Sequence, residues 1–158
     1  MEKRKIYVGV IGGSDAPQDV CGKAELVGRD VARAGAFLLC GGRSGVMEAA
    51  CRGAKSAGGT TIGLLPGDER GTENDHVDIA LPTGMGEMRN MLLVHASDVL
   101  IAVGGEFGTL SELAFALRVG KPVVGVGTWE LSKEGRLSDA IHVVDDPAKA
   151  VSVALDLV

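Results

Sequence analysis

Residues 98–120, DVLIAVGGEFGTLSELAFALRVG, hold the pattern that decides the fold. Positions 99–103 are all apolar, which is typical of a strand that is buried on both faces of a sheet. Two glycines end this run, and apolar residues then recur at helical spacing through 109–120. The stretch therefore predicts a buried strand, a tight glycine turn and a helix, in that order.

The same alternation extends over the rest of the chain. Strands are predicted at 5–13, 36–42, 60–67, 77–85, 98–105, 121–127 and 140–146, and helices at 18–34, 45–58, 86–97, 109–120 and 147–158. The first helix is expected to place four residues inward: Val20, Leu26, Val27 and Val31. Segments that alternate in this way build parallel sheets covered by helices on both faces. We therefore predict an α/β fold, a single Rossmann-like, doubly wound domain over residues 1–158, with a mostly parallel sheet of about six or seven strands. The pattern predicts no structure for residues 127–139.

Composition excludes several classes of function. The net charge is −5 and acidic and basic residues are interspersed, so the chain lacks the basic stripe of a nucleic-acid-binding protein. No apolar run approaches the roughly 18 residues of a membrane span, so we expect no membrane contact. An odd number of cysteines without CxxC spacing argues against a disulfide framework and for a reduced, cytoplasmic setting. The histidines, which show no spacing typical of metal ligands and predict no metal site, are His76, His95 and His142.

Three of the predicted strands end in similar glycine turns, at 11–15, 40–45 and 103–109. The carboxyl ends of parallel strands form the ligand crevice of such folds. Glycines there let backbone N–H groups approach a ligand, and each following helix directs its positive end towards it. The turns therefore predict a site for a phosphate-type anion. The candidate ligand-binding residues are Gly12, Gly13, Ser14, Gly41, Gly42, Arg43, Gly45, Gly105, Glu106, Phe107, Gly108 and Thr109. No turn matches the P-loop or the GxGxxG pattern, so neither an ATPase nor an ordinary dinucleotide site is indicated.

Charged and hydroxyl side chains near these turns have two interpretations each. Arg89 has a planar guanidinium that suits phosphate or carboxylate, although a single helical arginine is also a common surface charge. Glu112 lies in the first turn of a predicted helix, where a carboxylate favours the helix dipole without any chemical duty. Thr109 can cap that helix or bind a phosphate oxygen. Glu106 repels an anion unless it faces away or accepts ligand hydroxyl groups.

Two motifs, CGGRSGVMEAA at 40–50 and MRNMLLVHASDVLIAVGGEFGTLSE at 88–112, resemble the LOG family over about residues 6–125. This family was long labelled as lysine decarboxylases, and its characterised members are cytokinin riboside 5′-monophosphate phosphoribohydrolases. The resemblance implies catalytic roles for Arg89 and Glu112 in cleaving the N-glycosidic bond of a nucleoside 5′-monophosphate. It also implies a phosphate site at Gly105, Gly108 and Thr109, with Gly41, Gly42 and Gly45 lining the crevice. The decarboxylase label finds no support, because pyridoxal phosphate needs a Schiff-base lysine and no lysine here has a partnering motif.

Three positions depart from the family pattern. Asn90 replaces a lysine, and Glu106 and Glu48 replace glycines. The two added acids and the lost base weaken the binding of a simple phosphate. The combination resembles a sister branch that contains the molybdenum cofactor carrier proteins, which bind a pterin phosphate without turning it over.

Two functions therefore stay open, both with a small phosphorylated ligand. One is a phosphoribohydrolase, and the other is a non-catalytic carrier whose bound ligand is the molybdenum cofactor, with no further cofactor required. The apolar surface of the segments MLLVHA and LAFALRV, together with the resemblance, predicts a homodimer or larger homo-oligomer. We expect helices 86–97 and 109–120 in its interface.

Overall fold

The computed structural model describes residues 4–158 and contains one seven-stranded sheet in the order β4-β3-β2-β1-β5-β6-β9. Its strands are β1 Tyr7–Gly12, β2 Phe37–Cys40, β3 Thr61–Leu65, β4 Ile79–Pro82, β5 Val99–Val103, β6 Val123–Val126 and β9 His142–Val143. Every pairing between neighbours in this sheet is parallel. The predicted Rossmann-like, doubly wound α/β fold is confirmed.

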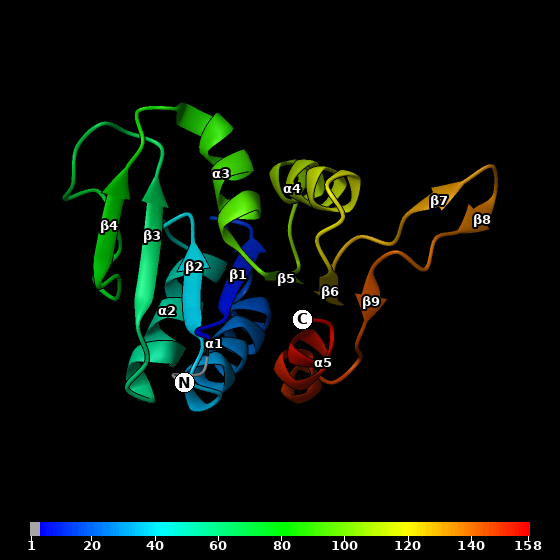
Figure 1. Cartoon of the computed structure of the whole chain (residues 1–158), viewed down its shortest axis with the longest axis horizontal. Helices are drawn as coiled ribbons and strands as arrows, with labels where there is room; N and C mark the ends of the chain where they lie inside the picture. Colours follow the sequence, from blue (N-terminus) through cyan, green and yellow to red (C-terminus); the bar gives the residue numbers. More distant parts are fainter. Residues whose placement is uncertain (1–3) are drawn as a thin grey trace.

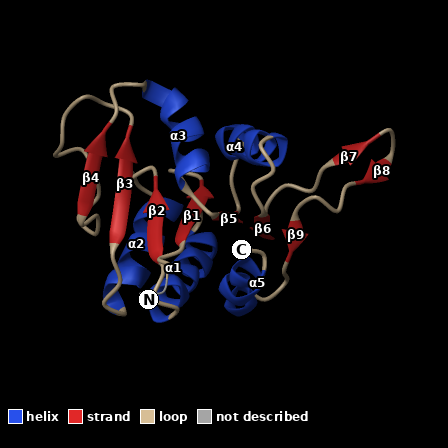
Figure 2. Ribbon diagram, in the orientation of Figure 1, coloured by secondary structure: helices blue, strands red, loops and turns tan. Residues whose placement is uncertain are grey.

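Helices cover both faces of the sheet (Figures 1 and 2). The elements are α1 Gln18–Arg33, α2 Val46–Ser56, α3 Arg89–Ala96, α4 Phe107–Arg118 and α5 Ala150–Asp156, with 3-10 turns η1 Gly86–Met88 and η2 Pro147–Lys149. Helices α1, α2 and α5 pack on one face, whereas α3 and α4 lie side by side on the other. The fully buried strand β5 separates two apolar cores, one under each helix layer. The strand order reverses at β1, because β2 to β4 are added on one side of it and β5, β6 and β9 on the other. The ligand crevice of such a sheet therefore lies where β1 and β5 end.

Helix α1 turns a different side to the core than its apolar residues predict. Val27 and Val31 are buried as expected, but Val20 and Leu26 are only half-buried. The reason is close contact with α2, because a side chain at Gly28 would overlap the Ala50 carbonyl. The small residues Ala24 and Gly28 therefore share the buried face of α1 with Val27 and Val31.

Residues 127–139, for which the sequence predicts no structure, form an arm that projects beyond the sheet (Figure 1). Its strands β7 Ser132–Lys133 and β8 Arg136–Leu137 pair antiparallel across a two-residue turn. Both turn residues have positive φ, 54° at Glu134 and 75° at Gly135. A turn of this kind matches the right-handed twist of paired strands, which explains why the arm is a regular hairpin.

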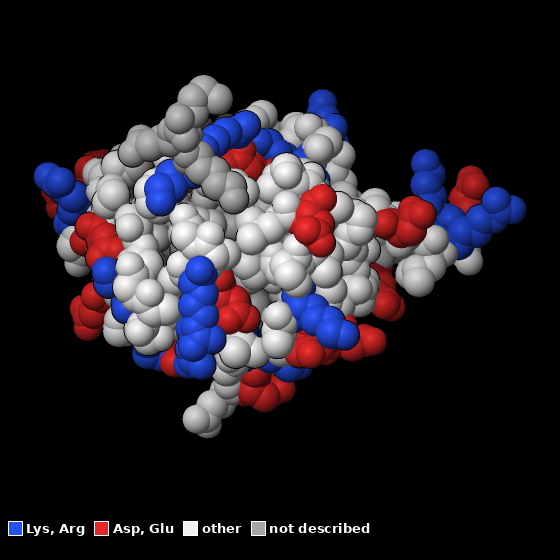
Figure 3. Space-filling model, turned by 60° about the horizontal axis from the view of Figure 1, so that its bottom comes forward, with Lys and Arg blue, Asp and Glu red and all other residues white. Residues whose placement is uncertain are grey.

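The surface agrees with the dispersed charge of the sequence. On the face drawn in Figure 3, acidic and basic side chains of the described residues alternate, and the basic ones form no continuous surface. Within residues 4–158, no helix is long and apolar enough to cross a membrane.

Candidate functional site

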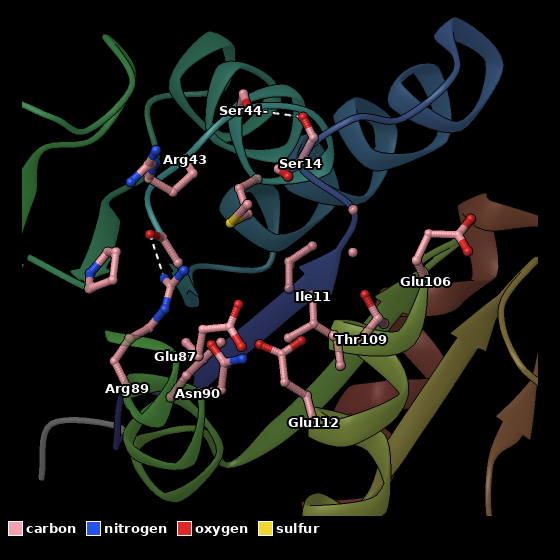
Figure 4. Close-up of a pocket in the computed structure, with 18 of the residues that line it drawn as sticks. Ile11, Ser14, Arg43, Ser44, Glu87, Arg89, Asn90, Glu106, Thr109 and Glu112 are labelled. Atoms are coloured by element: carbon pink, nitrogen blue, oxygen red, sulfur yellow. Dashed lines mark hydrogen bonds between the residues drawn. The ribbon is translucent and has the colours of Figure 1, made fainter. Parts of the chain in front are cut away.

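A cavity of about 470 Å³ lies at the carboxyl ends of β1, β2 and β5 (Figure 4). All three predicted glycine turns contribute to its lining. Its residues are Val10, Ile11, Gly12, Gly13, Ser14, Asp15, Gly41, Arg43, Ser44, Met47, Pro66, Glu87, Arg89, Asn90, Leu93, Glu106, Gly108, Thr109 and Glu112. The volume falls within the range of about 300–1,000 Å³ that is usual for small-molecule sites.

The turns after β1 and β2 form one continuous surface, residues 12–14 and 41–45, which we call the amide cradle. The Val46 N–H donates to the Gly13 carbonyl at 3.0 Å, and the Ser44 hydroxyl donates to the Ser14 carbonyl at 2.8 Å. These two bonds fix the start of α2 against the β1 turn. Gly45 has φ 65°, and a side chain there would overlap the Gly13 carbonyl. Glycine is therefore required for the two turns to meet.

The amide cradle contains backbone N–H groups without a backbone partner. The N–H groups of Ser14, Arg43 and Ser44 donate to no backbone acceptor among the described residues. The first N–H groups of α2 and α4 are also free of intrahelical partners, as at any helix start. Unpaired backbone donors at helix N-termini are a common setting for phosphate or carboxylate.

The third turn, 104–109, differs from its sequence interpretation at two residues. Helix α4 begins at Phe107, so Thr109 is buried in its first turn and does not cap the helix. Phe107 lies outside the cavity lining, with its residue surface 75% exposed and its ring packed on Trp129 at 5.5 Å between centroids. Glu106 lines the rim, and its side chain points away from Glu112 (Figure 4).

Arg89 connects the ends of two strands. Its Nη1 donates to the Gly41 carbonyl at 2.6 Å and to the Leu64 carbonyl at 2.7 Å. A side chain at Gly41 would overlap the guanidinium, so the close approach depends on glycine. Burial lowers the pKa of Arg89, and the nearby Glu112 carboxylate opposes that change. Arg89 therefore positions the amide cradle in addition to bringing positive charge to the cavity.

The Glu112 side chain points towards Glu87 and Asn90 (Figure 4). Desolvation by burial raises the pKa of Glu112 to about 7, although the positive charge of Arg89 acts in the opposite direction. Near neutral pH this carboxyl group is thus divided between its protonated and ionised forms. A side chain of this kind can donate, accept or exchange a proton with a ligand.

Behind the amide cradle lies a pair of buried thiols. The sulfur atoms of Cys40 and Cys51 are 3.4 Å apart, and Cys40 Sγ accepts a hydrogen bond from the Gly42 N–H at 3.3 Å. Both cysteines are free. Hydrogen bonding from the Cys51 thiol lowers the pKa of Cys40. Cys40 therefore supports the turn from beneath and does not line the cavity.

Comparison with known proteins places this architecture in a family. The profile of the SLOG cluster4 family matches residues 5–151. The chain belongs to the SLOG cluster4 family. This membership confirms the LOG-type resemblance of the two glycine motifs.

Solved structures similar to this SLOG cluster4 chain include two that concern the molybdenum cofactor. One is the molybdenum cofactor binding protein from Rippkaea orientalis, with a TM-score of 0.87, 36% identity and 98% coverage of both chains. Another is the molybdenum cofactor carrier protein from Chlamydomonas reinhardtii, with a TM-score of 0.86, 40% identity and 98% coverage of both chains. An uncharacterised protein from Archaeoglobus fulgidus is 39% identical over 150 residues, which is 95% of each chain. The carrier proteins expected as a sister branch are thus among the similar structures.

The structure brings most of the proposed site residues of this SLOG cluster4 chain to one cavity. Both residues with proposed catalytic roles line it, as do Gly12, Gly13, Ser14, Gly41, Arg43, Glu106, Gly108 and Thr109. Gly42, Gly45 and Gly105 lie outside the lining and shape the turns, since all three have positive φ. Phe107 is the one residue directed to a different surface.

Sequence reasoning did not assign several residues that the cavity uses. Glu87 and Ser44 line it, but nothing in the motifs separates them from ordinary surface residues. Asn74 holds the amide cradle from outside, with its N–H on the Gly42 carbonyl at 2.9 Å and its side-chain amide on the Arg43 carbonyl at 2.8 Å. Asn74 comes from a polar loop whose sequence indicates only exposure. Among residues 4–158, no group of three or more His, Cys, Asp or Glu side chains is placed to hold a metal ion.

Proposed function

We propose that this protein binds a phosphorylated, nucleotide-like ligand, with the phosphate against the amide cradle and the organic part in the cavity. The observation that carries this proposal is the set of unpaired N–H groups at Ser14, Arg43 and Ser44 beside the start of α2. Preorganised backbone donors stabilise a phosphate without demanding a lysine.

Within this proposal, carriage without turnover is the favoured activity, and the molybdenum cofactor is the named candidate for the cargo. Support comes from two similar structures, at 36% and 40% identity over 98% of the chain, that are described as molybdenum cofactor binding and carrier proteins. The cavity suits the phosphate of such a cargo through the amide cradle, and its carboxyl side chains suit N–H groups of a ring. In this proposal the residues of the chain bind and shield the cargo and do not take part in its chemistry.

Thermal melting tests binding at the amide cradle. Ribose 5-phosphate, AMP, GMP and a pterin phosphate at millimolar concentration should include at least one ligand that raises the melting temperature. Gly13→Asp should abolish that shift, because a side chain there has no neighbour closer than 3.8 Å but adds a negative charge to the amide cradle. Gly22→Asp is the matched control, since Gly22 lies on α1 with nothing within 4 Å of the added group. A protein indifferent to all four ligands contradicts the proposal.

A second candidate function is hydrolysis of the N-glycosidic bond of a nucleoside 5′-monophosphate. The observation that favours it is the desolvated Glu112 beside the positive charge of Arg89. A carboxylate next to the sugar stabilises the oxocarbenium-like charge that develops during cleavage. Release of free adenine from AMP, lost in Glu112→Gln while AMP binding is retained, would establish this activity. If AMP binds but stays intact, the hydrolase function is excluded and only the carrier function remains.

We also propose that the protein forms a homodimer or larger homo-oligomer through α3 and α4. Exposed apolar side chains of this layer include Met91 and Leu92 of α3 and Met88 of the preceding η1, with Met88 at 66%. His95 packs edge-on against Phe115 at 5.3 Å, which joins the two helices into one surface. Sedimentation that shows a stable monomer at micromolar concentration would count against this assembly. We further propose that the protein is cytoplasmic and that residues 1–158 form a single domain.

A further inference from the structure

The cavity has two unlike walls. One is the amide cradle, which offers hydrogen-bond donors. The other consists of Glu87, Asn90 and Glu112, whose side chains point towards one another in Figure 4 and which we call the acceptor wall. Glu87 comes from η1, Asn90 from the first turn of α3 and Glu112 from α4, so three separate elements bring these groups together.

The charges of the lining show that phosphate recognition alone does not account for this wall. Four carboxyl side chains line the cavity, Asp15, Glu87, Glu106 and Glu112, against two guanidinium groups, Arg43 and Arg89. Nη1 of Arg89 is already bound to two backbone carbonyls, which limits what it offers to a ligand. Carboxylates repel a ligand that is only an anion. A ligand that fits both walls must therefore bring hydrogen-bond donors as well as its phosphate.

The shape and polarity of the space between the walls select the kind of donor. Ile11, Met47 and Leu93 line it, and they suit the faces of a flat ring better than a chain of hydroxyl groups. An ionised carboxylate has two parallel acceptor oxygens, which match a pair of adjacent N–H donors. In such a pair both donors lie on one edge of the ring.

We propose that the acceptor wall recognises a ring edge on which a ring N–H lies next to an exocyclic amino group. The 2-amino-4-oxo-pyrimidine edge shared by guanine and pterins has this arrangement. Adenine lacks it, because its ring N1 carries a lone pair that would face a carboxylate. This inference rests on the proposed function and names the class of ring that the cavity selects. It assigns Glu87 and Glu112 as specificity-determining residues and Asn90 as a donor to the carbonyl next to the edge.

Three nucleotides isolate the edge chemistry, since GMP, IMP and AMP share the phosphate and the ribose. GMP has the 2-amino group and the ring N–H, IMP has only the ring N–H, and AMP has neither of these, since its amino group lies at position 6 beside the lone pair of N1. Titration calorimetry on the full chain should rank their affinities as GMP, then IMP, then AMP. We expect GMP to bind at least about 10-fold tighter than IMP, which corresponds to about 1.4 kcal/mol. AMP should be weaker still.

Two variants locate the preference. Glu87→Gln and Glu112→Gln should each bring the GMP and IMP affinities to within about 3-fold of each other, because an amide offers one acceptor where a carboxylate offers two. Glu130→Gln removes the same charge from outside the cavity lining and should keep the full preference. Circular dichroism and melting curves verify that each variant folds.

The outcomes separate this inference from the proposal on which it rests. Equal binding of GMP, IMP and AMP overturns the ring selectivity and leaves phosphate binding intact, as does a GMP preference that survives in both Gln variants. If neither the nucleotides nor ribose 5-phosphate bind, the proposed function fails and the inference fails with it. A GMP preference that disappears in either Gln variant but not in Glu130→Gln supports the assignment.

Discussion

Glu112→Gln should change how the stability of the protein depends on pH. The folded protein raises the pKa of Glu112 from its ordinary value of 4.5 to about 7, because burial disfavours the charged form. Between these two pH values the native state binds more protons than the unfolded chain. Stability must then fall as pH rises through this window, since it rises only where the unfolded state holds more protons.

The magnitude follows from the two pKa values. Each pH unit between 4.5 and about 7 is equivalent to about 1.4 kcal/mol. The full interval would give about 3 kcal/mol, and residual contact of the half-buried Glu112 with solvent reduces this figure to about 2–3 kcal/mol. The wild-type protein should lose this amount between pH 4.5 and pH 8 through Glu112 alone. Glutamine does not titrate, so the variant should not show this part of the loss.

Urea unfolding at pH 5, 6, 7 and 8 measures the effect. The informative quantity is the difference in unfolding free energy between wild type and Glu112→Gln at each pH, because other titrating groups largely cancel in it. That difference should move by about 2–3 kcal/mol in favour of the variant from pH 5 to pH 8. Glu130→Gln controls for the loss of one negative charge. A difference that stays flat across this range would show that Glu112 is not desolvated, and the account of its raised pKa would be wrong.

Three further substitutions test other parts of the structure. Arg89→Met should cost about 2–3 kcal/mol in urea unfolding, because two half-buried backbone carbonyls lose a charged donor. Gly28→Ala should lower the melting temperature by several degrees through overlap with the Ala50 carbonyl, whereas Gly22→Ala on the same helix should leave it unchanged or raise it. Asn74→Ala should weaken phosphate binding more than stability, because it removes the side-chain donor to the Arg43 carbonyl in the amide cradle; equal losses in calorimetry and in urea unfolding would refute this role.

The order of strands and helices could be predicted from the sequence because its signals are local. An apolar run such as 99–103 specifies a buried strand by itself, and the glycines after it specify a turn. Parallel topology then places every such turn at the same edge of the sheet, so much of the cavity follows from the motifs. The resemblance to the LOG family adds Arg89 and Glu112 to that edge.

Errors arose where the structure depends on contacts between distant segments. Threonine is favoured at the N-cap of a helix, which is why the sequence suggests this role for Thr109. The chain, however, becomes helical at Phe107, as soon as the turn of Gly104 and Gly105 is complete. The inner face of α1 is set by its contact with α2, and hydrophobicity alone does not reveal which residues meet there. Glu134 and Gly135 form a turn of the kind that favours Asn-Gly, so the sequence signal for this hairpin was weak.

Asn74 and Glu87 show the remaining limit of sequence reasoning. Each reaches the cavity region from a segment that is polar and turn-rich, where most residues only contact solvent. Their importance depends on which backbone carbonyl or which side chain of a remote element lies opposite. Such information is present only in three dimensions.

The two hydrogen bonds from Arg89 to the ends of β2 and β3 have a consequence for how cargo would be exchanged. A binding site that is held in shape by hydrogen bonds within the protein keeps the same form with and without its ligand. If the proposed binding holds, ligand uptake would change the outer surface of the protein little. Release would then depend on competition for the ligand rather than on a change of shape.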